Sequence, residues 1–236
     1  MDPLVEKAQR FAQEIEDLVN KTICTDFRLE TLQTVPGQVQ IVSKPMSEAI
    51  SLKPVSHPIE FSQLVRGKPV LGIKLGYSVE LDSKTKDLRV RTSSAAITLI
   101  QEKEKPIIRL EFERDQGLEP GKISARKHSR HAAHVHIHGT SADLSYIWGL
   151  HGRHAKRDLE SLHIPVGGRR FRPTIEDLIE FLCQEEIING IKPGGLKALE
   201  QGRTRWLAIQ LTSTIRGNLP EAIKIIEAEG YTVIRA

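Results

Sequence analysis

Two stretches of the chain predict its architecture most directly: VLGIKLGYSVEL at residues 70–81 and LRVRTSSAAITLI at residues 88–100. Both are long and rich in apolar and β-branched residues, and the polar segment DSKTKD at residues 82–87 joins them. Two such runs with a polar turn between them are typical of an antiparallel hairpin. We therefore expect this hairpin to form the centre of a sheet.

Shorter segments on both sides extend the hairpin into an antiparallel meander. Residues 27–43 and 107–114 show the two-residue alternation of strands. Three prolines within residues 45–68 predict loops and a short strand in that stretch. Ahead of the meander, residues 3–20 carry apolar side chains at three- to four-residue spacing, which predicts an amphipathic helix.

The end of the chain is expected to be helical. TIED at residues 174–177 is a capping box, because the threonine can accept a free backbone N–H and the acid three residues later can accept another. PGG at 193–195 predicts a break before a longer helix to about Arg216, and a last helix starts near 218 and stops at Gly230. Residues 231–235 suggest a short strand. We therefore predict an α+β fold, with a domain at 1–172 and a helical segment at 173–236 packed on it.

Cysteine content and hydropathy indicate the cellular compartment of the protein. The chain has two cysteines far apart and no CxxC motif, which favours a reducing environment. We find no signal peptide and no run of about 18 apolar residues that would suit a spanning helix. We expect a cytoplasmic protein without a membrane partner.

The net charge of +4 is unevenly distributed. Residues 121–172 hold 10 Lys/Arg and 3 Asp/Glu. By contrast, residues 1–120 hold 17 Lys/Arg and 18 Asp/Glu, and residues 173–236 hold 7 Lys/Arg and 9 Asp/Glu. The same middle segment contains eight of the nine histidines. A basic stretch of this kind is typical of binding to a polyanion such as RNA, and its alternative is a solvated basic loop.

Two strands in this region carry the candidate chemistry. Alternation in 107–113 places Arg109, Glu111 and Glu113 on one face, and alternation in HVHIH at 134–138 does the same for three histidines. Consecutive strands often pair, so these ionisable faces are expected to meet. The alternative is an edge strand with a wet polar face.

Such a surface suits two chemistries. A divalent ion such as zinc, manganese or iron has suitable ligands in His134, His136 and Glu113. Alternatively, His134, His136 and His138 act as general acids and bases, because a pKa near 6.5 suits proton transfer at neutral pH. Glu111 would then orient the imidazoles, and Arg109 would steady the charge that develops on a phosphorane.

Two basic segments are candidates for binding nucleic-acid phosphates. The long connection 114–133 contributes Arg126, Lys127 and Arg130. GGRRFRP at 167–173 contributes Arg169, Arg170 and Arg172, beside a helix N-terminus that also favours anions. The alternatives are a mobile insert for the first segment and a solvated linker for the second.

Residues 106–186 resemble TumE-type toxins of bacterial toxin–antitoxin pairs. The resemblance lies in the Arg/Glu-containing strand at 107–113, the histidine strand at 134–138 and the block RRFRPTIEDLIEFL. The block also resembles uncharacterised bacterial proteins. The toxin resemblance implies a partner antitoxin and action on RNA, and a phage-defence effector with the same core fits equally well. The toxins are shorter than this chain.

Three hypotheses follow. The first is a nucleic-acid-directed phosphodiesterase, such as a ribonuclease, that uses the His/Glu/Arg face. The second is a non-catalytic module that binds nucleic acid or a partner protein. The third is a metalloenzyme that acts on a small molecule.

Overall fold

The structure is a computed structural model. It describes residues 2–45, 47–50, 71–100, 106–114, 132–139, 164–166 and 172–234. Most of the stretch 45–68, where loops and a short strand are expected, lies outside these residues.

The N-terminal helix α1 spans Pro3–Thr22 and begins as its sequence dictates. The Asp2 carboxylate accepts the Leu4 N–H at 2.9 Å, and Pro3 occupies the first turn, where no backbone N–H is needed. Its apolar positions are buried against the sheet, among them Leu4, Ala8 and Ile15. The predicted helix at residues 3–20 is confirmed.

Within the described residues, the sheet is a seven-stranded antiparallel meander in which every strand pairs with its neighbour in sequence. Its strands are β1 (Leu29–Val35), β2 (Gln38–Ser43), β3 (Leu71–Leu81), β4 (Leu88–Leu99), β5 (Pro106–Glu113), β6 (Ala133–Ile137) and β7 (Ile164–Pro165). The predicted central hairpin is β3–β4, paired from Leu71↔Leu99 to Leu81↔Leu88. The α+β prediction is confirmed.

Alternation along these strands gives the sheet two different faces. Phe11 of α1 packs edge-on against Tyr77 of β3, with ring centroids 5.2 Å apart, so Tyr77 marks the helix face. Tyr77 pairs with Ser93, and Ser93 pairs with Phe112, so these residues share that face. The opposite, polar face carries Gln40, Val42, Lys74, Gly76, Ser78, Thr92, Ser94, Ala96, Arg109, Glu111, Glu113, His134 and His136.

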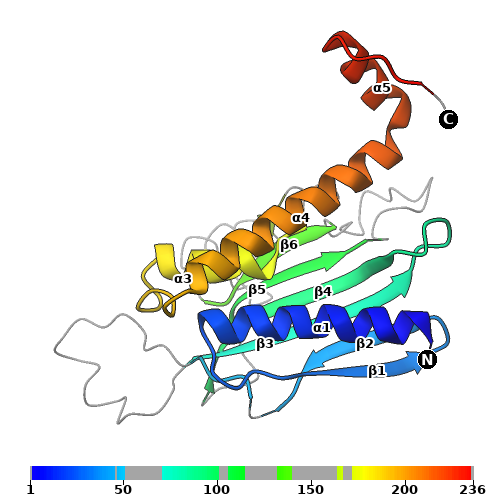
Figure 1. Ribbon diagram of the computed structural model, residues 1–236. Helices are drawn as coiled ribbons and strands as arrows, with labels where there is room; N and C mark the ends of the chain where they lie inside the picture. The colour runs from blue at the N-terminus through cyan, green and yellow to red at the C-terminus, as the bar shows by residue number, and fades with distance from the viewer. Residues whose placement is uncertain are drawn as a thin grey trace, which may run out of the picture.

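Helices α1 and α4 (Gly195–Gly217) lie on the helix face of the sheet, as Figure 1 shows. Fully buried side chains from this layer include Phe27, Ile73, Ile97, Leu178 and Leu182. One hydrophobic cluster includes residues from α1, the strands and the C-terminal helices. The C-terminal segment therefore shares a core with the sheet.

Helix α3 (Ile175–Gln184) starts at the predicted capping box. The Thr174 backbone N–H donates to Asp177 Oδ2 at 2.7 Å, and the Asp177 N–H donates to Thr174 Oγ1 at 3.3 Å. This cap fixes the point at which the chain turns into the helix. Its apolar positions, including Leu178, Ile179 and Leu182, are then buried.

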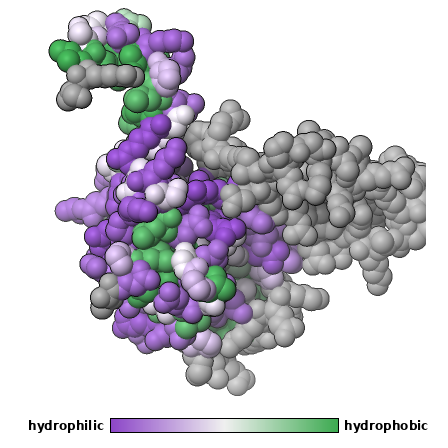
Figure 2. All heavy atoms as spheres, turned by 90° about the vertical axis from the view of Figure 1, so that its right-hand side faces the viewer, coloured by the Kyte–Doolittle hydropathy of each residue, from purple (hydrophilic) through white to green (hydrophobic). Residues whose placement is uncertain are grey.

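Helices α4 (Gly195–Gly217) and α5 (Leu219–Ala228) leave the core progressively. Leu199 and Gly202 of α4 are buried, whereas α5 has no buried residue. α5 projects from the body in Figure 1, and Figure 2 shows hydrophobic surface on this projection at the top of the molecule. The strand predicted at 231–235 is wrong for its described residues, because 231–234 are exposed coil and pair with none of the strands that the structure describes.

Candidate metal centre

The two strands that carry the candidate site pair as predicted. β5 and β6 are antiparallel, and their register places Glu111 opposite His134 and Arg109 opposite His136. The side chains of directly opposite residues lie on one face of the sheet, so this register brings the ionisable positions of both strands together. The predicted meeting of carboxylate and imidazole groups is confirmed for these residues.

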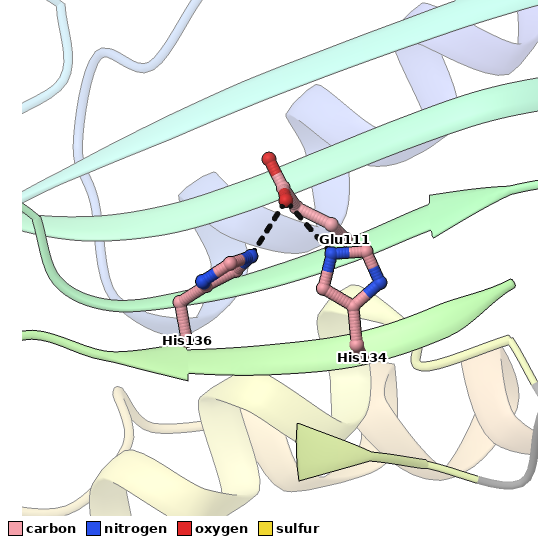
Figure 3. A group of neighbouring side chains, drawn as sticks. All are labelled: Glu111, His134 and His136. Atoms are coloured by element: carbon pink, nitrogen blue, oxygen red, sulfur yellow. Dashed lines mark hydrogen bonds and ion pairs between the residues drawn. The ribbon is translucent and has the colours of Figure 1, made fainter. Parts of the chain in front are cut away.

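Glu111, His134 and His136 form a compact cluster (Figure 3). The Nε2 atoms of His134 and His136 both lie 3.0 Å from Glu111 Oε2. The two imidazoles meet edge to face, with ring centroids 4.9 Å apart. Both histidines are buried, at 3% and 4% exposure, so the contacts are shielded from bulk water.

Arg109 holds the other oxygen of the same carboxylate. Its Nε lies 3.0 Å from Glu111 Oε1, so the guanidinium contacts one carboxylate oxygen and the two imidazoles contact the other. Burial raises the pKa of Glu111, but Arg109, His136 and His134 together outweigh it and leave that pKa below its ordinary value. Glu111 is therefore ionised at neutral pH.

The charge of Glu111 fixes the hydrogen-bond roles in the cluster. An ionised carboxylate only accepts hydrogen bonds, so both imidazoles donate from Nε2. A divalent ion would take the place of these protons, because neutral imidazole nitrogen and carboxylate oxygen are ordinary ligands of zinc, manganese and iron. The three ligand atoms lie within 4.8 Å of one another. Bonds of about 2.0–2.2 Å to one ion need only small side-chain movements.

The carboxylate in the cluster is Glu111, in place of the predicted ligand Glu113. Glu113 lies one residue pair further along β5 and is exposed, and its N–H donates to Ala132. The residue at that level is thus Ala132, just before β6, and not a histidine. The position opposite His134 belongs to Glu111 because the register is fixed by the paired backbones.

His138, the third predicted histidine, follows the last residue of β6. Its N–H donates to the Ile107 carbonyl at 2.9 Å, and its side chain is half-buried. Among the described residues, the group able to hold a metal comprises Glu111, His134 and His136 without His138. The structure therefore joins two of the three predicted histidines to a carboxylate.

The predicted phosphate-binding residues divide into two sets. Arg172 lies on the helix face, with its guanidinium carbon 4.4 Å from the centroid of the Trp206 ring, and burial lowers its pKa. Arg172 and Glu111 nevertheless line one common cavity, together with Tyr77 and Ser94. The others lie outside the described residues: Arg126, Lys127, Arg130, Arg169 and Arg170.

Sequence reasoning missed the small residues beside the cluster. Gly76 and Ser94 stand opposite one another on β3 and β4, and Ser94 stands opposite Glu111. A glycine inside a strand often marks a close approach by another group, and this signal was available at Gly76.

Comparison of the chain with protein-family models, curated proteins and solved structures gave no match. The similarity to TumE-type toxins stays a prediction. In the part of the chain that the structure describes, none of the helices combines the length and apolar character needed to cross a membrane.

Proposed function

We propose that this chain is a cytoplasmic, metal-dependent phosphodiesterase that cleaves nucleic acid, with Glu111, His134 and His136 as the ligands of its ion. The observation that carries the proposal is the convergence of two buried imidazole nitrogens on one carboxylate oxygen, each at 3.0 Å. A divalent ion with two neutral ligands and one carboxylate keeps a net positive charge. Such an ion polarises a phosphoryl oxygen and lowers the pKa of a bound water.

The charge of the chain supports a polyanionic substrate. Residues 121–172, which include both histidine ligands, hold 10 Lys/Arg against 3 Asp/Glu. Basic residues concentrated in one stretch of a chain are typical of proteins that bind nucleic-acid phosphates. RNA cleavage by a bacterial toxin with a partner antitoxin, or by a phage-defence effector, is the biological setting we propose.

The surrounding residues have defined parts in this reaction. Hydrolysis forms a bond between the water oxygen and phosphorus and breaks the bond from phosphorus to one ester oxygen, which leaves with a proton. His134 and His136 bind the ion through Nε2, and Glu111 binds it through Oε2. Arg109 is a positioning residue, because its contact with Oε1 keeps Oε2 directed at the imidazoles.

The test combines elemental analysis of the purified protein with an RNA-degradation assay. We expect one equivalent of a divalent transition metal, loss of cleavage in EDTA and recovery with Mn²⁺ or Zn²⁺. The double variant His134→Ala/His136→Ala should lose metal and about 10²-fold or more of its activity. Ile137→Ala is the matched control, because this side chain is on the same strand and 42% exposed.

Each contrary result identifies another function. Cleavage that is insensitive to chelation would mean that the histidines act as acid and base without an ion. Salt-sensitive binding without turnover would indicate a non-catalytic nucleic-acid module. Stoichiometric metal without action on nucleic acid would indicate an enzyme for a small molecule.

A further inference from the structure

A hollow on the polar face adjoins the metal centre. It has a volume of about 340 Å³, and Glu111 and His134 form part of its wall. Its polar-face lining consists of Gln40, Val42, Gly76, Ser78, Thr92, Ser94, Glu111, Glu113 and His134. Pockets for small ligands begin at about 300 Å³, so this hollow has room for about one nucleotide unit.

Small residues in the middle of the sheet create the hollow. Gly76 and Ser94 lie between Val42 of β2 and Glu111 of β5 in one row across the strands. A Cβ added at Gly76 would meet no atom within 4 Å, so the space above this residue is open. The row continues to His134, and the floor of the hollow therefore leads directly to the metal centre.

The chemistry of the lining suits a sugar–phosphate backbone. Ser78, Thr92 and Ser94 offer hydroxyl groups, and Gln40 offers an amide, which are common partners of phosphate and sugar oxygens. The aromatic residues at this level, Tyr77 and Phe112, belong to the helix face. They also border the hollow, together with Ser93, and the side chains of the polar face are the part of the lining that offers hydrogen bonds to a backbone.

We propose that this hollow binds one sugar–phosphate unit of single-stranded nucleic acid and presents its phosphodiester to the metal centre. The inference rests on the proposed function and names its substrate-binding floor. Glu111 and Glu113 on the lining repel phosphate unless an ion offsets their charge. Binding in the hollow should accordingly require the divalent ion.

Substitution of Gly76 tests the inference without disturbing the ligands. Gly76 is outside the left-handed backbone region and a Cβ there meets no atom within 4 Å, so a side chain can be introduced without backbone strain. It is two strands away from Glu111, about 9–10 Å across the sheet. A leucine at this position fills the floor of the hollow and leaves Glu111, His134 and His136 in place.

The experiment measures anisotropy of a fluorescein-labelled uridine oligonucleotide with and without Mn²⁺, and cleavage of the same probe. Gly76→Leu should weaken Mn²⁺-dependent binding on the order of tenfold or more and lower cleavage in parallel. Gly76→Ala should have a smaller effect. Gln33→Leu, at an exposed β1 position outside the hollow, is the control. Metal content should be unchanged in all three variants, and none of them should have a lower melting temperature than the wild type.

The outcomes separate this inference from the proposed function. If the wild type binds the probe without cleaving it, and Gly76→Leu weakens binding, then the proposed binding in the hollow is supported and the proposed phosphodiesterase activity is wrong. If Gly76→Leu binds and cleaves like the wild type, the hollow is overturned and the phosphodiesterase stands. If the wild type neither binds nor cleaves the probe, both the proposed binding in the hollow and the proposed phosphodiesterase activity are overturned. If the probe binds equally well without Mn²⁺, the proposed metal-dependent binding in the hollow is overturned.

Discussion

The two faces of the sheet differ in what their side chains do, although the same strands supply both. On the helix face, Ile73 and Ile97 are fully buried against the core. On the polar face, the same ladder holds Glu111 between Arg109 and two histidines. The register of the strands is therefore shared, whereas stability comes mainly from one face and the candidate chemistry from the other.

The two faces should differ most in how much a substitution on strand β4 lowers the free energy of unfolding. Ile97 is fully buried on the helix face, so Ile97→Ala should lower the free energy of unfolding by about 2–5 kcal/mol. Ser94 lies on the polar face beside open space, and Ser94→Ala should lower it by about 0.5 kcal/mol or less. Urea unfolding of both variants measures the contrast. Equal losses would show that the polar face contributes to the core.

Metal binding should stabilise the polar face by an amount that depends on concentration. With Mn²⁺ or Zn²⁺ at about 100 times its dissociation constant, the free energy of unfolding should rise by about 2.7 kcal/mol. The His134→Ala/His136→Ala variant should lose this increment, and Ile137→Ala should keep it. Thermal unfolding at increasing metal concentration provides the measurement. An equal response in the double variant would place the ion elsewhere.

The sequence predicted the helix face well because hydrophobic periodicity determines it. The α1 spacing, the β3–β4 hairpin and the Thr174 capping box all follow from contacts between residues near in sequence. The sequence pattern did not predict the exposed coil at 231–234. Its apolar residues suggest a strand, but a strand needs a pairing partner that the sequence pattern cannot specify.

The polar face was predictable only in part. Alternation identified the faces of β5 and β6, but alternation cannot specify their register. A shift of two residues preserves the faces and exchanges Glu111 for Glu113 as the partner of His134. The choice between these carboxylates, and the placing of Gly76 beside them, required the paired backbones of three strands.

Two glycines sharpen the contrast between packed and open regions. A Cβ on Gly195, at the start of α4, would lie 2.8 Å from the Lys21 carbonyl oxygen and 2.4 Å from Ile191 Cγ2. Gly195→Ala should therefore lower the free energy of unfolding by about 1–3 kcal/mol. Gly76→Ala meets no atom within 4 Å and should be neutral or slightly stabilising. Denaturant unfolding of both variants would contradict this if Gly195→Ala were the neutral one.

The smallest expected effect is the pH dependence that Glu111 gives to stability. Because its pKa is lowered in the folded chain, its contribution is present above the ordinary value of 4.5 and is lost as the pH falls through the folded value. Glu111→Gln removes this titration. The wild type should exceed Glu111→Gln in free energy of unfolding by about 1 kcal/mol or less near pH 6 without metal.

That advantage should shrink as the pH is lowered below 4.5 and the carboxylate takes up a proton. Urea unfolding of both proteins in EDTA at each pH isolates the effect from metal binding. Asp82→Asn is a comparison at a partly exposed carboxylate in the β3–β4 turn, whose pKa is lowered mainly by the backbone N–H groups of Thr85 and Lys84. A difference between wild type and Glu111→Gln that grows as the pH falls would mean that burial governs Glu111. The ion-paired arrangement inferred for the polar face would then be wrong.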